Sequence, residues 1–228
     1  MLSVEDLKQL NTIAYQKNLW KDYGIIEEYK YWISGFNCCL FKYKNNIVLC
    51  FIGTKGVQDI VNDLTMISGI VPSQAKQALK IYNEIKSKYS NIILTGHSLG
   101  ASIAQYMASQ TNNKAICFSP FGIKLFNSGR FNNIINYGME SDLIYMSNLE
   151  NQIGQVYLLE NPKNKYHFIK HGKINYPLLA NKSLRLDIGI QGHSLEQYGS
   201  LSKALQVDMQ LLNKFIIQNY CRTGLIQK

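Results

Sequence analysis

Residues 91–108 read Asn-Ile-Ile-Leu-Thr-Gly-His-Ser-Leu-Gly-Ala-Ser-Ile-Ala-Gln-Tyr-Met-Ala. Their centre is a GxSxG pattern, Gly96-His97-Ser98-Leu99-Gly100. Apolar residues before the pattern predict a strand over 91–95, and small and apolar residues after it predict a helix over 101–110. A serine on a sharp strand-to-helix turn is held in a strained conformation, and flanking glycines let the neighbouring backbone approach it. The pattern therefore predicts a nucleophilic Ser98 at a helix N-terminus that favours developing negative charge.

The sequence on both sides alternates between strand-like and helix-like patterns. Strands are predicted over 37–44, 46–53, 91–95, 114–119, 132–137 and 155–159, and helices over 3–18, 73–89, 101–110 and 195–218. Such alternation is typical of an α/β protein whose mostly parallel central sheet is flanked by helices. Asn45 and Asn46 indicate a tight turn between the first two strands, which would form an antiparallel edge.

The length and composition fit one globular domain over residues 1–228. The chain has 228 residues, of which 46% are hydrophobic and 17% charged. We find no internal repeat and no apolar run near the roughly 18 residues of a membrane helix. The first residues carry acids where a secretory signal peptide needs lysines and an apolar stretch. We therefore expect a protein that is cytoplasmic or delivered by a non-classical or effector route, with peripheral membrane contact as a further expectation.

Five cysteines are present, and Cys50 and Cys117 lie in strand-like apolar runs. No CxxC pair or other metal-ligand spacing accompanies them. We expect free, reduced cysteines that pack in the interior, and neither a metal nor a cofactor.

The formal net charge is +9, which favours anionic partners such as nucleic acid or acidic lipid. Residues 161–186 contain no Asp or Glu, and Tyr166, Phe168 and Tyr176 are interleaved among their basic side chains. Those basic residues are Lys163, Lys165, Lys170, Lys173, Lys182 and Arg185. The run is either a solvated loop or a surface for an anionic partner. No zinc, helix-turn-helix or RNP-like motif accompanies the charge, so we do not expect nucleic-acid binding.

A serine nucleophile needs a base and an acid that orients the base, in the chain order serine, acid, histidine for this type of fold. His193 fits the base because it lies in a glycine-containing turn immediately before the predicted final helix. Asp142 fits the acid because it follows the strand over 132–137 at the edge where parallel strands end. The alternatives are Glu140, Glu150 and Asp187 for the acid, and His167 and His171 for the base. His97, inside the motif, is expected to pack beside the strand.

The oxyanion of such a reaction needs two donors. The backbone N–H of Leu99, directly after the nucleophile, is expected to be one. The second should come from a loop after an earlier strand. Thr54 follows the strand end at Gly53 and fits this place. Its position alone is equally typical of an ordinary turn residue.

Three segments of the chain resemble class 3 lipases, the fungal-lipase-like branch of the α/β-hydrolases. They are Phe51-Ile52-Gly53-Thr54 with Asp59 and Val61-Asn62-Asp63-Leu64, the elbow from Gly96 to Gly100 with Ala104, and His193-Ser194-Leu195 with Tyr198. The resemblance implies an α/β-hydrolase fold, with Ser98 as nucleophile, Asp142 as acid and His193 as base. It also implies that Thr54 holds the oxyanion and that Asp63 orients the Thr54 loop. The family places its lid where this chain has the apolar segment 65–73, and an ordinary packed connection fits this segment equally well. Ile52 and Ala101 depart from the family pattern, which has Arg and a second Gly at these places.

The resemblance implies a serine ester hydrolase that acts on acyl esters of lipids, such as a phospholipase A, a lysophospholipase or an acylglycerol lipase. The basic run suggests docking on an anionic membrane through Lys163, Lys165, Lys170 and Lys173, which would favour phospholipid over triglyceride. A soluble esterase, thioesterase or acyltransferase is the alternative within the fold. The alternative without enzymatic activity is a non-catalytic module of the same fold that binds lipid or protein. The oligomeric state stays open.

Overall fold

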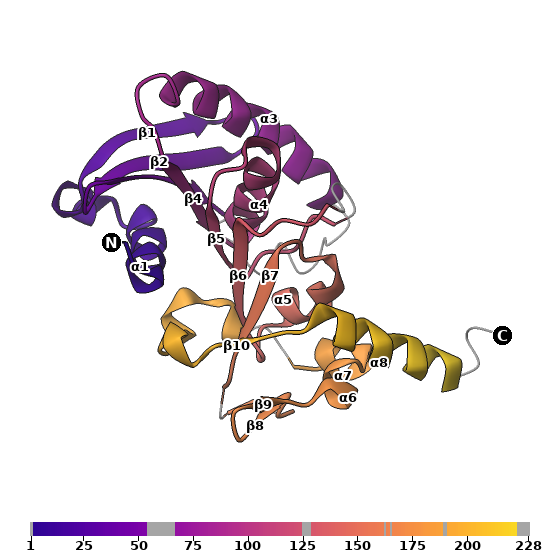
Figure 1. The fold of residues 1–228 in the computed structure, drawn as a ribbon. Helices are drawn as coiled ribbons and strands as arrows, with labels where there is room; N and C mark the ends of the chain where they lie inside the picture. Colours follow the sequence, from indigo (N-terminus) through magenta and orange to yellow (C-terminus); the bar gives the residue numbers. More distant parts are fainter. Residues whose placement is uncertain are drawn as a thin grey trace.

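The computed structural model describes residues 2–53, 67–124, 129–161, 163–164, 166–188 and 191–222. Its centre is an eight-stranded sheet in the order β1-β2-β3-β4-β5-β6-β7-β10 (Figure 1). The strands are Ile25–Tyr31 (β1), Phe36–Tyr43 (β2), Asn46–Ile52 (β3), Ile92–His97 (β4), Ala115–Phe118 (β5), Ile134–Met139 (β6), Gln155–Leu159 (β7) and Leu205–Gln206 (β10). Strands β3 to β7 are parallel, and antiparallel pairs close both edges. The predicted mostly parallel sheet with an antiparallel edge is confirmed.

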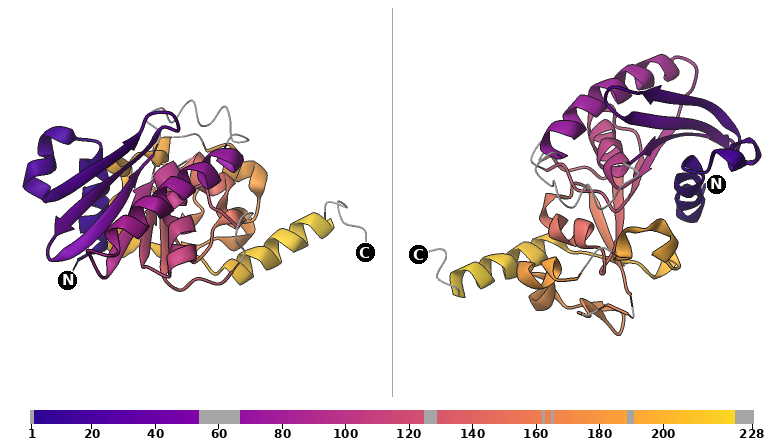
Figure 2. Two further views of the ribbon diagram at one scale, coloured as in Figure 1. Left: turned by 90° about the horizontal axis from the view of Figure 1, so that it is seen from above. Right: turned by 180° about the vertical axis from the view of Figure 1, so that it is seen from behind.

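Helices cover both faces of this sheet. Helices α3 (Ile67–Ile85) and α4 (Leu99–Thr111) lie together on one face, and α1 (Val4–Ala14) lies on the other (Figures 1 and 2). The pleat of β3 explains both layers, since Leu49 and Phe51 belong to the core cluster under α3 and α4. Val48 and Cys50 belong to the cluster under α1.

The N-terminal helix begins at a complete capping box. The Ser3 hydroxyl accepts from the Asp6 backbone N–H, and the Asp6 carboxylate accepts from the Ser3 backbone N–H. The helix is shorter than the predicted 3–18, because α1 ends at Ala14 and a 3-10 helix, η1, continues from Lys17 to Tyr23.

The turn between β2 and β3 lies one residue earlier than predicted. Lys44 and Asn45 have φ values of 46° and 60°. Two successive residues with positive φ are what a tight hairpin turn of the type I′ family requires. Asn46 is therefore the first residue of β3 rather than a turn residue.

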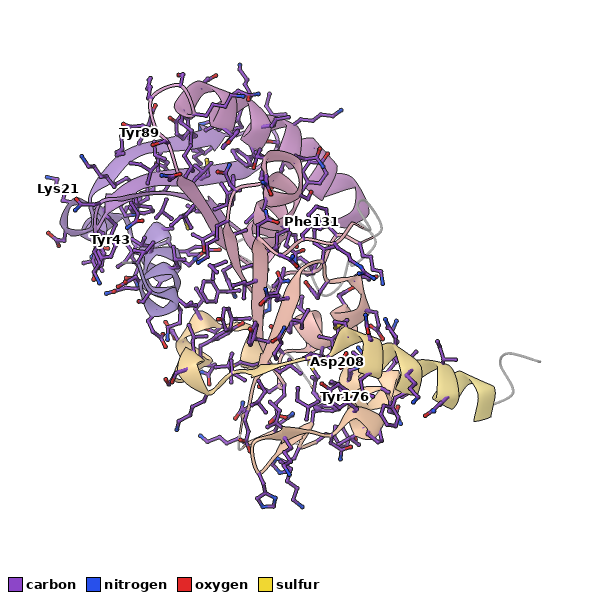
Figure 3. All side chains as sticks on the ribbon, viewed as in Figure 1. Lys21, Tyr43, Tyr89, Phe131, Tyr176 and Asp208 are labelled. Atoms are coloured by element: carbon purple, nitrogen blue, oxygen red, sulfur yellow. The ribbon has the colours of Figure 1, made fainter. Side chains whose placement is uncertain are left out.

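Short elements pack around β7 at the far end of the sheet. They are α5 (Leu143–Ser147), η2 (Leu149–Asn151), the hairpin of β8 (Ile169–Lys170) and β9 (Lys173–Ile174), α6 (Tyr176–Leu179), α7 (Lys182–Leu186) and α8 (Met209–Arg222). Tyr176 and Asp208 lie side by side where α6 meets the start of α8 (Figure 3), and the Asp208 backbone N–H donates to the Tyr176 hydroxyl at 2.8 Å.

The basic run over 161–186 is not a plain solvated loop. Phe168 and Ile169 are fully buried in the core cluster of this end. Arg185 is fully buried too, and its guanidinium pairs with the Glu150 carboxylate. The expectation that Arg185 belongs to a basic surface is therefore wrong, whereas Lys170 and Lys173 are exposed on the β8–β9 hairpin.

The predicted final helix over 195–218 is also wrong. In its place the chain forms 3-10 turns at Leu195–Gln197 (η4) and Leu201–Lys203 (η5), then β10, and α8 begins only at Met209. The helix predicted over 73–89 is α3, which runs from Ile67 to Ile85.

Cys38, Cys39, Cys50 and Cys117 are free and buried. Among the residues that the structure describes, no cluster of three or more His, Cys, Asp or Glu side chains has the arrangement of a metal site. None of the described helices combines the length and apolarity that crossing a bilayer requires.

Candidate active site

Ser98 lies on the sharp turn between β4 and α4, as the motif predicts. Its backbone has φ 58° and ψ −126°, a conformation that L-residues rarely adopt. A hydrogen bond of 3.0 Å from its backbone N–H to the Phe118 carbonyl ties the turn to the end of β5. The turn therefore holds the Ser98 side chain at the edge where the parallel strands end.

The two motif glycines are required by close backbone contacts. A Cβ on Gly96 would lie 2.3 Å from the carbonyl carbon of Gly100, and a Cβ on Gly100 would lie 2.1 Å from the carbonyl oxygen of Phe51. Both distances are far below a normal contact, so these positions accept only glycine without displacement of the elbow.

His193 and Asp142 are brought together from loops 51 residues apart. The Nδ1 atom of His193 lies 3.0 Å from Oδ2 and 3.1 Å from Oδ1 of Asp142. His193 lies in the 3-10 turn η3 (Gln191–His193), and Asp142 follows β6 and caps α5. The Oδ1 atom of Asp142 accepts from the backbone N–H groups of Ile144 at 3.0 Å and Tyr145 at 3.2 Å.

The carboxyl group of Asp142 is fully buried yet held in its ionised form. Burial disfavours the charge, but the contacts with His193, the Ser119 hydroxyl and the Tyr145 backbone outweigh this and keep the pKa of Asp142 below its ordinary value. A buried carboxylate beside Nδ1 fixes the ring so that Nδ1 carries a proton and Nε2 is free to accept one.

Ser119 and Tyr198 extend this network beyond the predicted residues. The Ser119 hydroxyl donates to Oδ2 of Asp142, and it lies 2.6 Å from the Tyr198 hydroxyl. Because the Ser119 proton goes to Asp142, the single Tyr198 proton is shared between the Ser119 oxygen and the Tyr137 carbonyl, which is 3.2 Å away. Ser119 follows β5 at the same sheet edge as Asp142, so the strand-end rule that finds Asp142 applies equally to Ser119.

His97 fixes the backbone of His193 rather than packing only against its strand. Its Nε2 atom lies 2.6 Å from the His193 carbonyl, and the two ring centroids are 4.8 Å apart. A carbonyl can only accept, so Nε2 of His97 must carry the proton. Burial, together with the nearby His193, lowers the pKa of His97 to about 3, so the ring is neutral.

Two buried polar atoms of the predicted triad have no hydrogen-bond partner in the part of the chain that the structure describes. Within the described residues, Ser98 Oγ and His193 Nε2 both lack a hydrogen bond. Each residue is only 1% exposed. A buried polar atom without a partner is costly for folding alone, and two such atoms on residues of the predicted triad indicate a function.

The other sequence candidates lie elsewhere. The Glu140 carboxylate accepts from the backbone N–H groups of Asn161 and Ile169, and the Glu150 carboxylate pairs with Arg185. The Asp187 carboxylate accepts from the Tyr166 hydroxyl at 2.7 Å. His167 and His171 are exposed. Of the acids considered, the structure brings Asp142 to His193.

The predicted oxyanion groups are only partly described. Leu99 is the first residue of α4, where the helix geometry leaves backbone N–H groups without an intrahelical acceptor. Thr54, Asp63 and Lys165 lie outside the described residues, as does the beginning of the segment 65–73. The strand end before Thr54 is described: the Gly53 N–H donates to the Tyr15 hydroxyl at 2.9 Å.

Gly53 also packs against the elbow. A Cβ built on it would lie 2.7 Å from the His97 carbonyl oxygen and 3.3 Å from Ser98 Cβ. The end of β3 therefore passes directly beside the nucleophile, and Tyr15 from the end of α1 anchors it.

A model of the Tle-like phospholipase domain family matches residues 3–133. The chain belongs to this family. The resemblance to lipases seen in the sequence is confirmed at this level. The matched range contains Ser98, whereas Asp142 and His193 lie beyond it and their proximity is seen only in the structure.

Known proteins similar to this Tle-like domain point to the same fold. The extracellular phospholipase A1 of Serratia liquefaciens is 26% identical over 98 residues, which are 42% of this chain and 31% of that protein. Two fungal lipase structures superpose on it. The lipase of Rhizopus microsporus var. chinensis gives a TM-score of 0.54 at 13% identity, covering 70% of this chain and 74% of that one. The triacylglyceride lipase of Rhizomucor miehei gives a TM-score of 0.53 at 13% identity, covering 68% of this chain and 78% of that one. The α/β-hydrolase fold is confirmed.

Proposed function

We propose that this Tle-like domain is a serine carboxylic ester hydrolase of the lipase type, with phospholipid acyl esters as its substrates. The observation that carries the proposal is that Ser98 Oγ and His193 Nε2 are both buried without a partner among the described residues, while the other ring nitrogen of His193, Nδ1, binds the Asp142 carboxylate. Family membership supports an acyl ester of a lipid as the substrate class, and the Serratia relative supports phospholipid within that class.

The proton path follows from the hydrogen bonds. Asp142 accepts from Nδ1 of His193, so Nε2 has a free lone pair. Nε2 removes the proton of Ser98 Oγ as this oxygen attacks the ester carbonyl. The imidazolium that forms is stabilised by Asp142, and it then protonates the leaving alcohol. An acyl-enzyme remains on Ser98, and water cleaves it through the same base.

The developing oxyanion is proposed to bind the Leu99 N–H and a group of Thr54. Leu99 begins α4, so the partial positive charge of the helix N-terminus adds to its N–H. Asp63 is proposed to orient the Thr54 loop. Removal of one such donor costs on the order of 100- to 1,000-fold in turnover.

Docking on an anionic membrane is proposed for the basic surface near β8 and β9. Lys163, Lys170 and Lys173 are exposed, and the chain between residues 161 and 186 contains no acid. Each lysine close to an anionic surface contributes about 1 kcal/mol. Lys165 belongs to the same basic run in the sequence. This surface would bring the site to phospholipid rather than to a neutral triglyceride.

The test is the release of fatty acid from phospholipid vesicles, from a triglyceride emulsion and from a soluble p-nitrophenyl ester, with Ser98→Ala assayed beside the unaltered protein. We expect release from phospholipid to exceed that from triglyceride and to vanish in Ser98→Ala. Hydrolysis of the soluble ester alone would favour a soluble esterase. Absence of release from all three by folded protein would contradict the proposal.

A further inference from the structure

Two large apolar side chains project from the turn between β1 and β2. The Trp32 side chain is 81% exposed, and Ile33 is fully exposed. Full exposure of a tryptophan beside an isoleucine loses the hydrophobic free energy that either side chain gains by burial. A pair of this kind at one loop tip therefore indicates an apolar partner.

The turn is fixed rather than loose. The Ser34 hydroxyl donates to the Gln77 side chain at 2.7 Å, and the Gln74 amide donates to the Ser34 carbonyl at 2.8 Å. Both glutamines belong to α3. These two bonds clamp the turn to the helix, so that the neighbouring Trp32 and Ile33 are held outward instead of folding back.

Strand register places this turn at the active-site edge of the sheet. Tyr31 pairs with Phe36 across the turn, and Asn37, the next residue of β2, pairs with Ile52 at the end of β3. Phe51 in turn pairs with Gly96, the first residue of the elbow. The β1–β2 turn therefore lies beyond the same strand ends as Ser98, and β1 and β2 run alongside α3 (Figure 1).

The charge around the turn is basic. Lys30 Nζ lies 3.7 Å above the Trp32 ring centroid, and Lys76 and Lys80 are exposed on the turns of α3 that hold Ser34. No Asp or Glu occurs between residues 29 and 36, or between residues 64 and 83. An apolar tip within a lysine-bearing surface matches an anionic bilayer, where tryptophan favours the headgroup level and lysine the phosphates.

We propose that Trp32 and Ile33 insert into the surface of an anionic phospholipid bilayer and so present the Ser98 edge to lipid, an inference that deepens and rests on the proposed phospholipase function. Two side chains at the tip of a turn can bury far less surface area than the roughly 800 Å² per partner of a stable protein–protein interface. A lipid surface needs no such area, because each side chain gains free energy separately on insertion.

Trp32 itself reports on this contact. The chain has two tryptophans, and Trp20 is half-buried with its ring N–H bound to the Ile13 carbonyl. Trp20→Phe leaves Trp32 as the single tryptophan, which is excited selectively over the 15 tyrosines at the red edge of the absorption band. Ser98→Ala prevents lipid turnover during the measurement. With phosphatidylcholine vesicles that contain phosphatidylglycerol, we expect a blue shift of the Trp32 emission and quenching by brominated acyl chains.

The matched comparison uses two pairs of exposed apolar residues. Trp32→Ala with Ile33→Ala should weaken vesicle partition about tenfold or more. It should lower vesicle phospholipid hydrolysis while leaving hydrolysis of a soluble p-nitrophenyl ester intact. Leu186→Ala with Ile217→Ala removes two side chains that are 49% and 57% exposed on α7 and α8, and it should leave partition unchanged.

Three results would overturn the inference. The first is a Trp32 emission that does not shift although the protein is bound to vesicles. The second is equal vesicle partition of the two paired variants. The third is an emission shift that needs no lipid and depends on protein concentration, which would mark self-association through the turn. Each concerns binding by the Ser98→Ala protein. Failure of the hydrolase proposal would instead appear as loss of all ester turnover, so the two failures are distinguishable.

Discussion

At the scale of single residues, the proposed chemistry depends most directly on Asp142. Its carboxylate accepts from His193, Ser119 and two backbone N–H groups at the start of α5. Asp142→Asn places an amide where the Nδ1 proton now points, which favours the wrong tautomer of His193. Loss of this acid in a serine triad lowers kcat by roughly 10⁴-fold. Steady-state kinetics on a p-nitrophenyl ester measure this, with circular dichroism as the control for folding, and a variant that retains a tenth of the activity would contradict the assigned role.

Ser119 is a positioning residue in the same network. Ser119→Ala removes one donor to the Asp142 carboxylate and one partner of the Tyr198 hydroxyl. Loss of a hydrogen bond to a charged group costs about 1.5 to 3 kcal/mol, so we expect kcat to fall by about tenfold or more with KM unchanged. The effect should disappear when Asp142→Asn is already present. If Ser119→Ala lowered kcat by the same factor in the unaltered protein and in Asp142→Asn, Ser119 would act independently of Asp142.

Glu140 makes the free energy of unfolding depend on pH. Burial raises its pKa to about 7, although the backbone N–H groups of Asn161 and Ile169 oppose the shift. The native protein therefore holds this proton more tightly than the unfolded chain, in which the pKa is near 4.5. The contribution of this proton to the free energy of unfolding is complete below about pH 4.5, and it is lost as the pH rises through about 7.

We thus expect the Tm to fall between about pH 5 and about pH 8, and to fall less in Glu140→Gln. Glu196→Gln, which alters an exposed side chain, is the matched control and should follow the unaltered protein. Parallel Tm profiles for all three proteins would contradict the assignment to Glu140.

Sequence rules pointed to two of the proposed triad residues, because Ser98 sits between a strand and a helix and Asp142 follows a parallel strand. His193 was proposed from its place in a turn before a predicted final helix over 195–218, which the structure does not contain. The contact of His97 could not be predicted, because a carbonyl partner 96 residues away leaves no local pattern. Sequence likewise did not reveal that Arg185 is buried, because its partner Glu150 lies in a separate element.

At the scale of elements, the η3 turn must lie close against the loop that begins α5. A Cβ on Gly192 would lie 2.4 Å from the Ser141 hydroxyl and 2.8 Å from the Asp142 backbone nitrogen. Gly192→Ala therefore pushes His193 away from Asp142, and we expect kcat to fall at least about 100-fold because small displacements of catalytic groups are costly.

Gly199→Ala provides the matched control, since a Cβ at that position meets nothing within 4 Å. It should retain the kcat and Tm of the unaltered protein. If Gly192→Ala kept full activity on the soluble ester, the close packing of η3 on the acid loop would not be needed for turnover.

Elements with periodic apolar residues were predictable, and those shaped by distant contacts were not. The final helix was mispredicted because Tyr198 and Leu201 are apolar at helical spacing but are buried from 3-10 turns against the face that carries α1. Strand β1 was missed because Glu27, Glu28 and Lys30 give it no apolar alternation, and its pairing with β2 defines it instead. Local pattern does not encode either outcome.

At the scale of the whole molecule, one sheet edge collects functional groups from the entire chain. Tyr15, Gly53, Ser98, Asp142 and His193 converge there although they span most of the sequence. The basic β8–β9 hairpin and the apolar β1–β2 turn lie at opposite ends of the molecule (Figure 1). Both follow strands that reach the Ser98 edge. The two proposed lipid contacts therefore differ in chemistry, one basic and one apolar. The single domain over 1–228 stays a prediction.

The central claim is that Ser98 is a nucleophile activated by His193, and covalent labelling tests it most directly. The folded protein is treated with an alkyl fluorophosphonate, digested and analysed by peptide mass spectrometry. We predict modification of Ser98, none at this position in Ser98→Ala, and a large drop in the labelling rate in His193→Ala. An unmodified Ser98 in protein that still hydrolyses phospholipid, or labelling of another serine, would contradict the account.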